Sequence, residues 1–155
     1  YEDLYDDLTI GMNSAWSQYA MAWVEGPNSS DDGGKYYLVN TSNPSNPAVR
    51  MGRRTPFLRQ YMYYVRAGAV RVGASSTSGK VEPVAFINVD GSYVVVAKLS
   101  SAEDFVIAGR PAGTYGLSYS TNAESNVELS DVTISAGQRV SAAIPASGVL
   151  TIYRK

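Results

Sequence analysis

The side chains that this chain offers for chemistry are carboxylates, tyrosines, lysines, arginines and hydroxyls. Its 155 residues include no His and no Cys, with 13 Lys+Arg against 14 Asp+Glu. There is therefore no Ser-His-Asp triad, Cys-His dyad, His-ligated metal, zinc–thiolate site or iron–sulfur cluster. A net charge of −1 gives no electrostatic footprint for nucleic acid or an anionic membrane. We expect no metal, no cofactor, and neither a nucleic-acid nor a membrane partner.

Two groups of acidic residues are better explained by structure than by a metal site. Glu2, Asp3, Asp6 and Asp7 crowd the start of a helical pattern, where the helix dipole favours negative charge. Asp31-Asp32 lies in a polar stretch, where a turn is a stronger expectation than a calcium site.

Two Asn-x-Ser/Thr sequons lie close together, at Asn28 and Asn40. Both fall in a stretch rich in Ser, Asn, Asp, Gly and Pro, which predicts exposed backbone. We expect carbohydrate on Asn28, Asn40 or both, and a secreted, extracellular glycoprotein. The absence of cysteine removes only the argument from disulfides.

The elements that would position these groups differ between the two parts of the chain. In the first part, residues at spacings of three and four form the stripe of an amphipathic helix: Leu4, Leu8, Met12, Ala15 and Tyr19. Gly11 and Asn13 weaken the interior of this helix.

A short apolar run, Ala20–Glu25, is typical of a buried strand and ends at Gly26-Pro27. Asn28–Pro47 then predicts a long surface loop, with Lys35–Val39 as a candidate short strand inside it.

A second helix is predicted after Thr55-Pro56, which places an N-cap residue before a proline at the first helical position. Apolar and aromatic residues follow at helical spacing, and Gly68 lies where a helix would stop. The first part therefore reads helix, strand, long loop, helix.

The second part, residues 69–155, is predicted to be entirely β. Turn residues separate apolar runs at intervals of about ten residues, the spacing of a sandwich. The hairpin signal Asp90-Gly91 is the strongest of these separators. The predicted strands are Ala69–Ala74, Pro83–Asn88, Ser92–Leu99, Phe105–Ile107, Thr114–Ser120, Val127–Ile134, Arg139–Ile144 and Gly148–Tyr153.

The chain has no apolar run near the roughly 18 residues needed to span a bilayer. It has no N-terminal signal peptide, and it begins at Tyr1 within a helical pattern. We expect a piece of a longer protein.

Several motifs resemble the C-terminal part of glycoside hydrolase family 30 enzymes. In that family the last barrel helix commonly ends in Phe-Ser-Lys-Phe-Ile-Arg-Pro-Gly and runs directly into a β side domain. Here the counterpart is Phe57–Gly68, with Met-Tyr-Tyr-Val in place of Phe-Ser-Lys-Phe and Ala67 in place of proline. The runs Val84–Asn88 and Gly91–Val96 match the side domain's Ala-Phe-x-Asn-x-Asp-Gly-Ser-x-Val-Val-Val pattern.

The resemblance implies residues 1–67 as the end of a (β/α)8 barrel and residues 68–155 as a β-sandwich side domain. The predicted fold is therefore mainly β: a C-terminal antiparallel sandwich preceded by a helix-strand-helix remnant of the barrel. Family members are retaining hydrolases with two catalytic Glu residues about 5 Å apart. Both are expected upstream of Tyr1, so this chain should have no catalytic residue of its own and would need an upstream barrel portion as its partner.

Glu25 ends the strand that would be the barrel's eighth, at the face where such active sites lie. Nothing in the sequence offers a partner carboxylate for it. Two interpretations stay open for Trp23 and Glu25: substrate contacts, with an indole stacking on a sugar and a carboxylate accepting hydroxyl bonds, or a core residue and a solvated one. Tyr36 and Tyr37, in the loop, are the better candidates for further sugar contacts.

Two classes of function are compatible with these patterns. One is the last portion of a secreted hydrolase whose partner is a polysaccharide such as β-1,6-galactan or xylan. The other is a non-catalytic module that binds carbohydrate or assembles with itself. The first segment discriminates them, because a stand-alone module has no need of an incomplete barrel.

Overall fold

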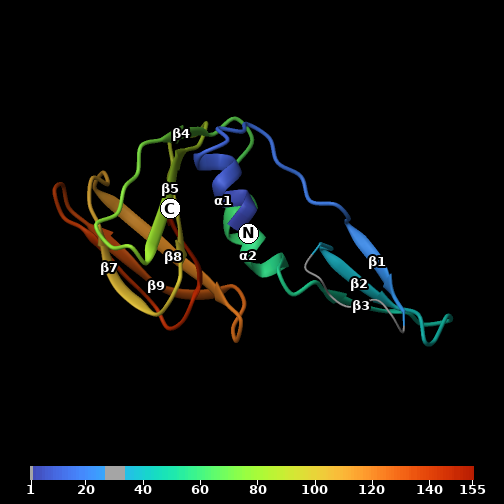
Figure 1. The fold of residues 1–155 in the computed structure, drawn as a ribbon. Coiled ribbons are helices and arrows are strands. Elements are labelled where there is room, and N and C mark those ends of the chain that lie inside the picture. Colours follow the sequence, from blue (N-terminus) through green and yellow to red (C-terminus); the bar gives the residue numbers. More distant parts are fainter. Residues whose placement is uncertain (1, 27–33) are drawn as a thin grey trace. The chain divides into compact units, whose positions relative to one another are not determined.

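The structure is a computed structural model that describes residues 2–26 and 34–155 (Figure 1). The chain divides into two compact units, residues 1–58 and residues 59–155. Each is described by itself. A domain boundary near residue 67 stays a prediction.

The first helix is shorter than its apolar stripe predicts. Helix α1 spans Glu2–Thr9, whereas the stripe continues to Tyr19. The backbone amides of Ile10 and Gly11 both donate to the carbonyl of Asp6, and Met12 then takes a φ of 54°. A residue in the left-handed region after such bonds ends an α-helix. The prediction of helix beyond Thr9 was therefore wrong.

The first unit contains a three-stranded sheet in the order β1-β2-β3, where the sequence predicts one strand and a candidate second (Figure 1). Strand β1 (Ala22–Glu25) runs parallel to β2 (Tyr37–Asn40), which runs antiparallel to β3 (Ala48–Met51). The predictions missed β3 because Ala48–Met51 follows Pro47 and gains its strand geometry from pairing with β2.

Strand β1 was predicted to be buried, and it is not. It lies at the edge of its sheet, and Trp23, 46% exposed, and Val24, 54% exposed, present much of their surface to solvent. An apolar run does not by itself say how many neighbouring strands will cover it.

Helix α2 spans Thr55–Met62, so Thr55 is inside the helix and not its cap. The carbonyl of Arg54 accepts the first helical bond, from the amide of Leu58. The Thr55 hydroxyl instead donates to the carbonyl of Tyr36, at 2.9 Å. The cap position was therefore mispredicted by one residue, because a tertiary acceptor takes the hydroxyl.

The second unit is an antiparallel β-sandwich, as predicted. A six-stranded sheet has the order β4-β5-β6-β11-β8-β9, and β7 and β10 form a second sheet (Figure 1). Every predicted strand is present with bounds that differ by a few residues at most. The observed strands are β4 (Val70–Val72), β5 (Val81–Ile87), β6 (Tyr93–Leu99), β7 (Glu103–Ile107), β8 (Gly113–Thr121), β9 (Val127–Ile134), β10 (Val140–Ile144) and β11 (Gly148–Arg154).

The core of this unit lies between its two sheets. Alternate residues of β8 and β11 contribute to this core, which follows from the two-residue period of a strand. The buried side chains of this core are Val81, Ala97, Leu99, Tyr115, Leu117, Tyr119, Ile134, Val140, Ala142, Ile144, Leu150 and Ile152.

On the other face of the six-stranded sheet, Gln60 of α2 makes a buried polar contact. Its side chain is fully buried, and Nε2 donates to the hydroxyls of Ser118 and Ser120 at 3.2 and 3.1 Å. The Thr151 hydroxyl donates to the carbonyl of Gln60 at 2.8 Å. These bonds fix the position of the C-terminal half of α2 against strands β8 and β11.

Candidate functional site

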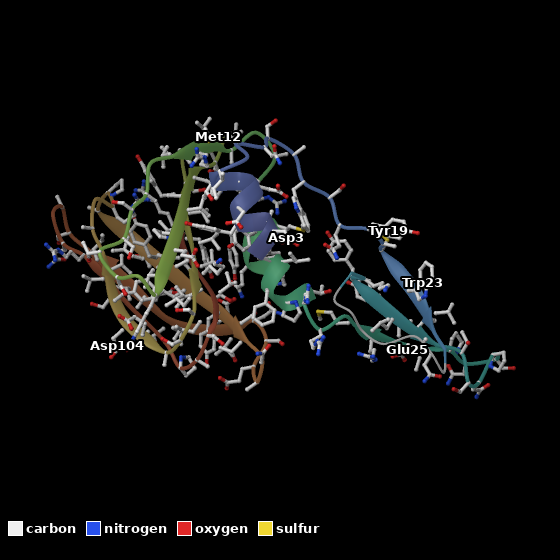
Figure 2. The ribbon with its side chains drawn as sticks, in the orientation of Figure 1. Asp3, Met12, Tyr19, Trp23, Glu25 and Asp104 are labelled. Atoms are coloured by element: carbon white, nitrogen blue, oxygen red, sulfur yellow. The ribbon has the colours of Figure 1, made fainter. Side chains whose placement is uncertain are left out.

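Trp23 and Glu25 both belong to β1 (Figure 2), and the alternation of side chains along a strand places them on the same face. Their partners across the parallel pair are Leu38 and Asn40 of β2. Leu38 is only 1% exposed, so a buried side chain lies beside the exposed indole and the partly exposed carboxylate. The structure thus places the two predicted sugar contacts together.

Arg50 of β3 holds the Glu25 carboxylate in place. Its Nε donates to Oε1 of Glu25 at 2.9 Å, and its Nη2 donates to the same oxygen. Both side chains reach into solvent, so the pair orients the carboxylate more than it stabilises the fold. The sequence analysis missed Arg50. The run Ala48–Met51 has no alternation to mark its strand, and the pairing of Arg50 with Glu25 spans 25 residues.

A second cation lies beside the indole. Nζ of Lys35 is 5.8 Å from the centroid of the Trp23 ring, within the range of a cation–π contact. The face therefore combines an aromatic surface, an oriented carboxylate and two positive charges. Such a set can stack on a sugar ring and accept or donate hydrogen bonds to its hydroxyls.

The two predicted tyrosines are separated from one another. Tyr37 pairs with Ala22 and Met51, which places it on the opposite face of the sheet from Trp23. Tyr36 precedes β2. Burial raises the pKa of its phenol, and a hydrogen bond to the backbone of Gln18 opposes that shift. A sugar held by Trp23 and Glu25 would therefore not also reach Tyr37.

Several carboxylates of the sandwich unit are bound to structural partners. Glu128 accepts hydrogen bonds from the hydroxyls of Tyr64 and Tyr153, at 2.9 and 3.1 Å. The other engaged pairs are Glu82 with Lys98, Glu103 with Lys80, Glu124 with Tyr119 and Asp131 with Lys155. Within residues 2–26 and 34–155, no group of three or more acidic residues could hold a metal ion.

Of the two glycosylation candidates, Asn28 lies outside the described residues. Asn40 is exposed at the end of β2, and its Oδ1 accepts a hydrogen bond from the backbone amide of Ser42 at 2.9 Å. No helix in the described part of the chain has the length and apolar character needed to cross a membrane.

Comparison with known proteins connects this fold to one family. Residues 68–152 match the family described as glycosyl hydrolase family 30 beta sandwich domain. No curated protein matches the chain.

The solved structures that share the fold include three with TM-scores of 0.74 to 0.76. The catalytic domain of GH30 xylanase C from Talaromyces cellulolyticus gives a TM-score of 0.76 at 23% identity, over 98% of this chain and 33% of that chain. A GH30 endoxylanase from Clostridium papyrosolvens C71 gives 0.75 at 18% identity, over 99% and 36%. A conserved exported protein from Bacteroides fragilis gives 0.74 at 17% identity, over 97% and 31%. This chain thus spans about a third of the length of each.

Proposed function

This chain belongs to glycosyl hydrolase family 30, whose beta sandwich domain it contains, and from that premise we propose that it is the C-terminal portion of a secreted retaining glycoside hydrolase. The substrate is a polysaccharide such as xylan or β-1,6-galactan. Xylan is favoured because the solved structures that share the fold include enzymes named xylanases. β-1,6-Galactan rests on the family resemblance of the sequence alone.

One observation carries this proposal: the fold match extends over 98% of this chain but only 33% of the xylanase from Talaromyces cellulolyticus. In the proposed assembly, the remaining part of such an enzyme is a barrel that supplies both catalytic carboxylates. This chain supplies the sandwich and the end of the barrel, and no catalytic residue.

The contribution of this chain to substrate binding is the exposed face of β1. The Trp23 indole stacks on the apolar face of a sugar ring, and Glu25, oriented by Arg50, accepts hydrogen bonds from sugar hydroxyls. Tyr36 and Tyr37 are assigned to separate, weaker contacts, since Tyr37 lies on the opposite face.

Binding of the whole chain to soluble xylan and β-1,6-galactan tests this assignment. In affinity electrophoresis, Trp23→Ala should weaken binding about two- to tenfold, the loss expected for one aromatic stacking contact. Trp16→Ala is the matched control, because Trp16 is partly exposed in the same unit but lies outside the sheet. Equal losses in both variants, or no loss in Trp23→Ala, would contradict the proposed contact.

Secretion is part of the same proposal, and it carries the expectation of N-linked carbohydrate on Asn28, Asn40 or both. The exposed position of Asn40 supports it. Peptide mapping of native protein should show the added mass. Unmodified asparagine at both positions would count against passage through a glycosylating pathway.

A second candidate function is a non-catalytic module that assembles with copies of itself. It is favoured by the face of the three-stranded sheet opposite Trp23, which carries only apolar and aromatic side chains: Ala22, Val24, Tyr37, Val39, Val49 and Met51. Most of these are exposed, and such patches are typical of association surfaces. Sedimentation velocity decides this: a chain that stays monomeric over a wide concentration range does not self-assemble.

A further inference from the structure

The sandwich unit contains a cavity of about 700 Å³ at one end of its core. It exists because the six-stranded sheet is much wider than the two-stranded one, and β10 neighbours β8 and β9. The inner faces of β5 and β6 are therefore left beside β7 and the loop at residues 73–78. Cavities of 300 to 1,000 Å³ are roughly the size that holds small ligands.

The cavity has an apolar floor and a hydroxyl-rich wall. Pro83 and Ala85 of β5 pair with Ala97 and Val95 of β6, and these four side chains line its floor. The wall comes from the loop between β4 and β5, whose four consecutive hydroxyl residues are Ser75, Ser76, Thr77 and Ser78. Among the described residues, the exposed hydroxyls of Ser75 and Thr77 have no hydrogen-bond partner.

Arg110 supplies the feature that points to a ligand. Its Nε and Nη1 atoms are buried and have no hydrogen-bond partner in the part of the chain that is described. Its guanidinium carbon lies 5.1 Å from the centroid of the Tyr93 ring, within the range of a cation–π contact. Buried donors are almost always paired in folded proteins, and a guanidinium fork matches a carboxylate.

The carboxylates nearest this cavity are not placed to satisfy Arg110. Glu103 accepts from Nζ of Lys80 at 3.1 Å and from the Ser78 hydroxyl at 3.5 Å. Asp104, labelled in Figure 2, lies at the rim of the cavity and is exposed, whereas its neighbours Glu103 and Phe105 are partly buried. The exposed Arg139 adds a second positive charge to the cavity wall. Glu103 and Asp104 also line the cavity, but Lys80 pairs with Glu103, so the two arginines leave a net positive charge that favours an anionic ligand.

We propose that this cavity binds a small sugar acid, independently of the polysaccharide contacts on β1. The carboxylate of the ligand pairs with Arg110, its hydroxyls bond to Ser75 and Thr77, and its C–H face lies on the floor formed by β5 and β6. The site is a non-catalytic binding site of the sandwich.

Calorimetric titration of the whole chain with D-galacturonate, D-galactose and acetate tests the proposal. Galacturonate should bind, galactose, which differs in lacking the carboxylate, should bind much more weakly, and acetate should bind more weakly than galacturonate. Arg110→Met should reduce the affinity for galacturonate about 10- to 100-fold, the loss expected for hydrogen bonds to a charged group. The control variant Arg71→Gln removes an exposed arginine of β4 outside the cavity, and it should leave the affinity for galacturonate unchanged.

A second variant avoids the core altogether. The double variant Ser75→Ala, Thr77→Ala alters only exposed loop side chains. It should lower the affinity for galacturonate and leave the affinity for acetate unchanged. Equal affinity for galacturonate and acetate would overturn the assignment of a sugar acid. If none of the three ligands binds, or if Arg110→Met binds galacturonate as tightly as the native chain does, the proposed binding site is wrong.

Discussion

At the scale of single residues, the sandwich contains a cluster of two tyrosines and one carboxylate. The rings of Tyr64 and Tyr153 stack with centroids 4.4 Å apart, and both hydroxyls donate to Glu128. Burial raises the pKa of both phenols, and the negative charge of Glu128 raises it further. The folded state therefore favours the neutral form of each tyrosine, so stability depends on pH through this cluster.

The sign of that dependence gives a prediction. The free energy of unfolding should be level up to about pH 9 and should fall as the pH rises above about 10, the ordinary pKa of tyrosine. A raised folded-state pKa contributes stability that is fully present below the unfolded pKa and is lost as the pH approaches the folded one. Urea unfolding at about pH 8, 10 and 11 measures the fall.

Tyr153→Phe sharpens the measurement, because it keeps the ring on Tyr64 and removes one titrating hydroxyl. The fall above about pH 10 should be shallower in this variant. The control variant Tyr63→Phe removes an exposed hydroxyl, and its free energy of unfolding should fall with pH as steeply as that of the native chain. Identical slopes in Tyr153→Phe and the native chain would show that this cluster does not set the alkaline limit.

At the scale of elements, the sandwich depends on how closely β8 and β11 approach. Gly148 begins β11, opposite Thr121 of β8 and Leu99 of β6. A Cβ at this position would lie 2.2 Å from the carbonyl oxygen of Ser120, where backbone must move to admit it. Gly148→Ala should therefore lower the free energy of unfolding by about 1–3 kcal/mol, the usual cost of overpacking.

Gly79→Ala is the matched control for this substitution. A Cβ there would meet no atom within 4 Å, and the position lies in the exposed turn before β5. Its free energy of unfolding should be unchanged or higher by about 0.4–1 kcal/mol, because alanine restricts the unfolded chain. Urea denaturation compares the two variants. Similar losses in both would mean that the Gly148 contact is not the cause.

The strands of the sandwich could be predicted because each signal for them is local. Turn residues such as Asp90-Gly91 and alternation such as that of Tyr115, Leu117 and Tyr119 lie within a few residues of one another. Strand β3 could not be predicted, because its geometry depends on pairing with β2. Helix α1 was predicted to be too long because apolar residues continue at helical spacing beyond its end. Gly11 and the left-handed backbone of Met12 end the helix.

The candidate site, like the fold, could be predicted only where its residues lie close together in the sequence. Strand alternation alone places Trp23 and Glu25 on one face, so the sequence could predict their proximity. The bond from Arg50 to Glu25 joins residues 25 apart, and the cavity beside Arg110 joins β5, β6, β7 and a loop. Contacts of this kind leave no periodic signature in one sequence, since they are created by the order of strands in the sheets.

At the scale of the whole chain, the carboxylates divide into two sets. Several of those in the sandwich unit have Lys, Tyr or Ser partners, as Glu82, Glu128 and Asp90 do. In the first unit, Glu25 is the acidic residue of the three-stranded sheet, and Arg50 orients it. Retaining hydrolysis needs a pair: one carboxylic acid and one carboxylate, about 5–5.5 Å apart across the scissile bond.

Isolated as residues 1–155, the chain is therefore expected to hydrolyse no glycoside at a measurable rate. Glu25 would stand without the second carboxyl group that an acid/base and nucleophile pair requires, and the pair's pKa values must also be driven apart by their surroundings. Assays with xylan, β-1,6-galactan and an aryl glycoside measure this. Glu25→Gln tests the candidate carboxylate, and Glu82→Gln, which alters an ion-paired carboxylate of the sandwich, is its control. Turnover by the purified chain that Glu25→Gln abolishes and Glu82→Gln preserves would place catalysis in this chain, and the proposed division of labour with a separate barrel portion would then be wrong.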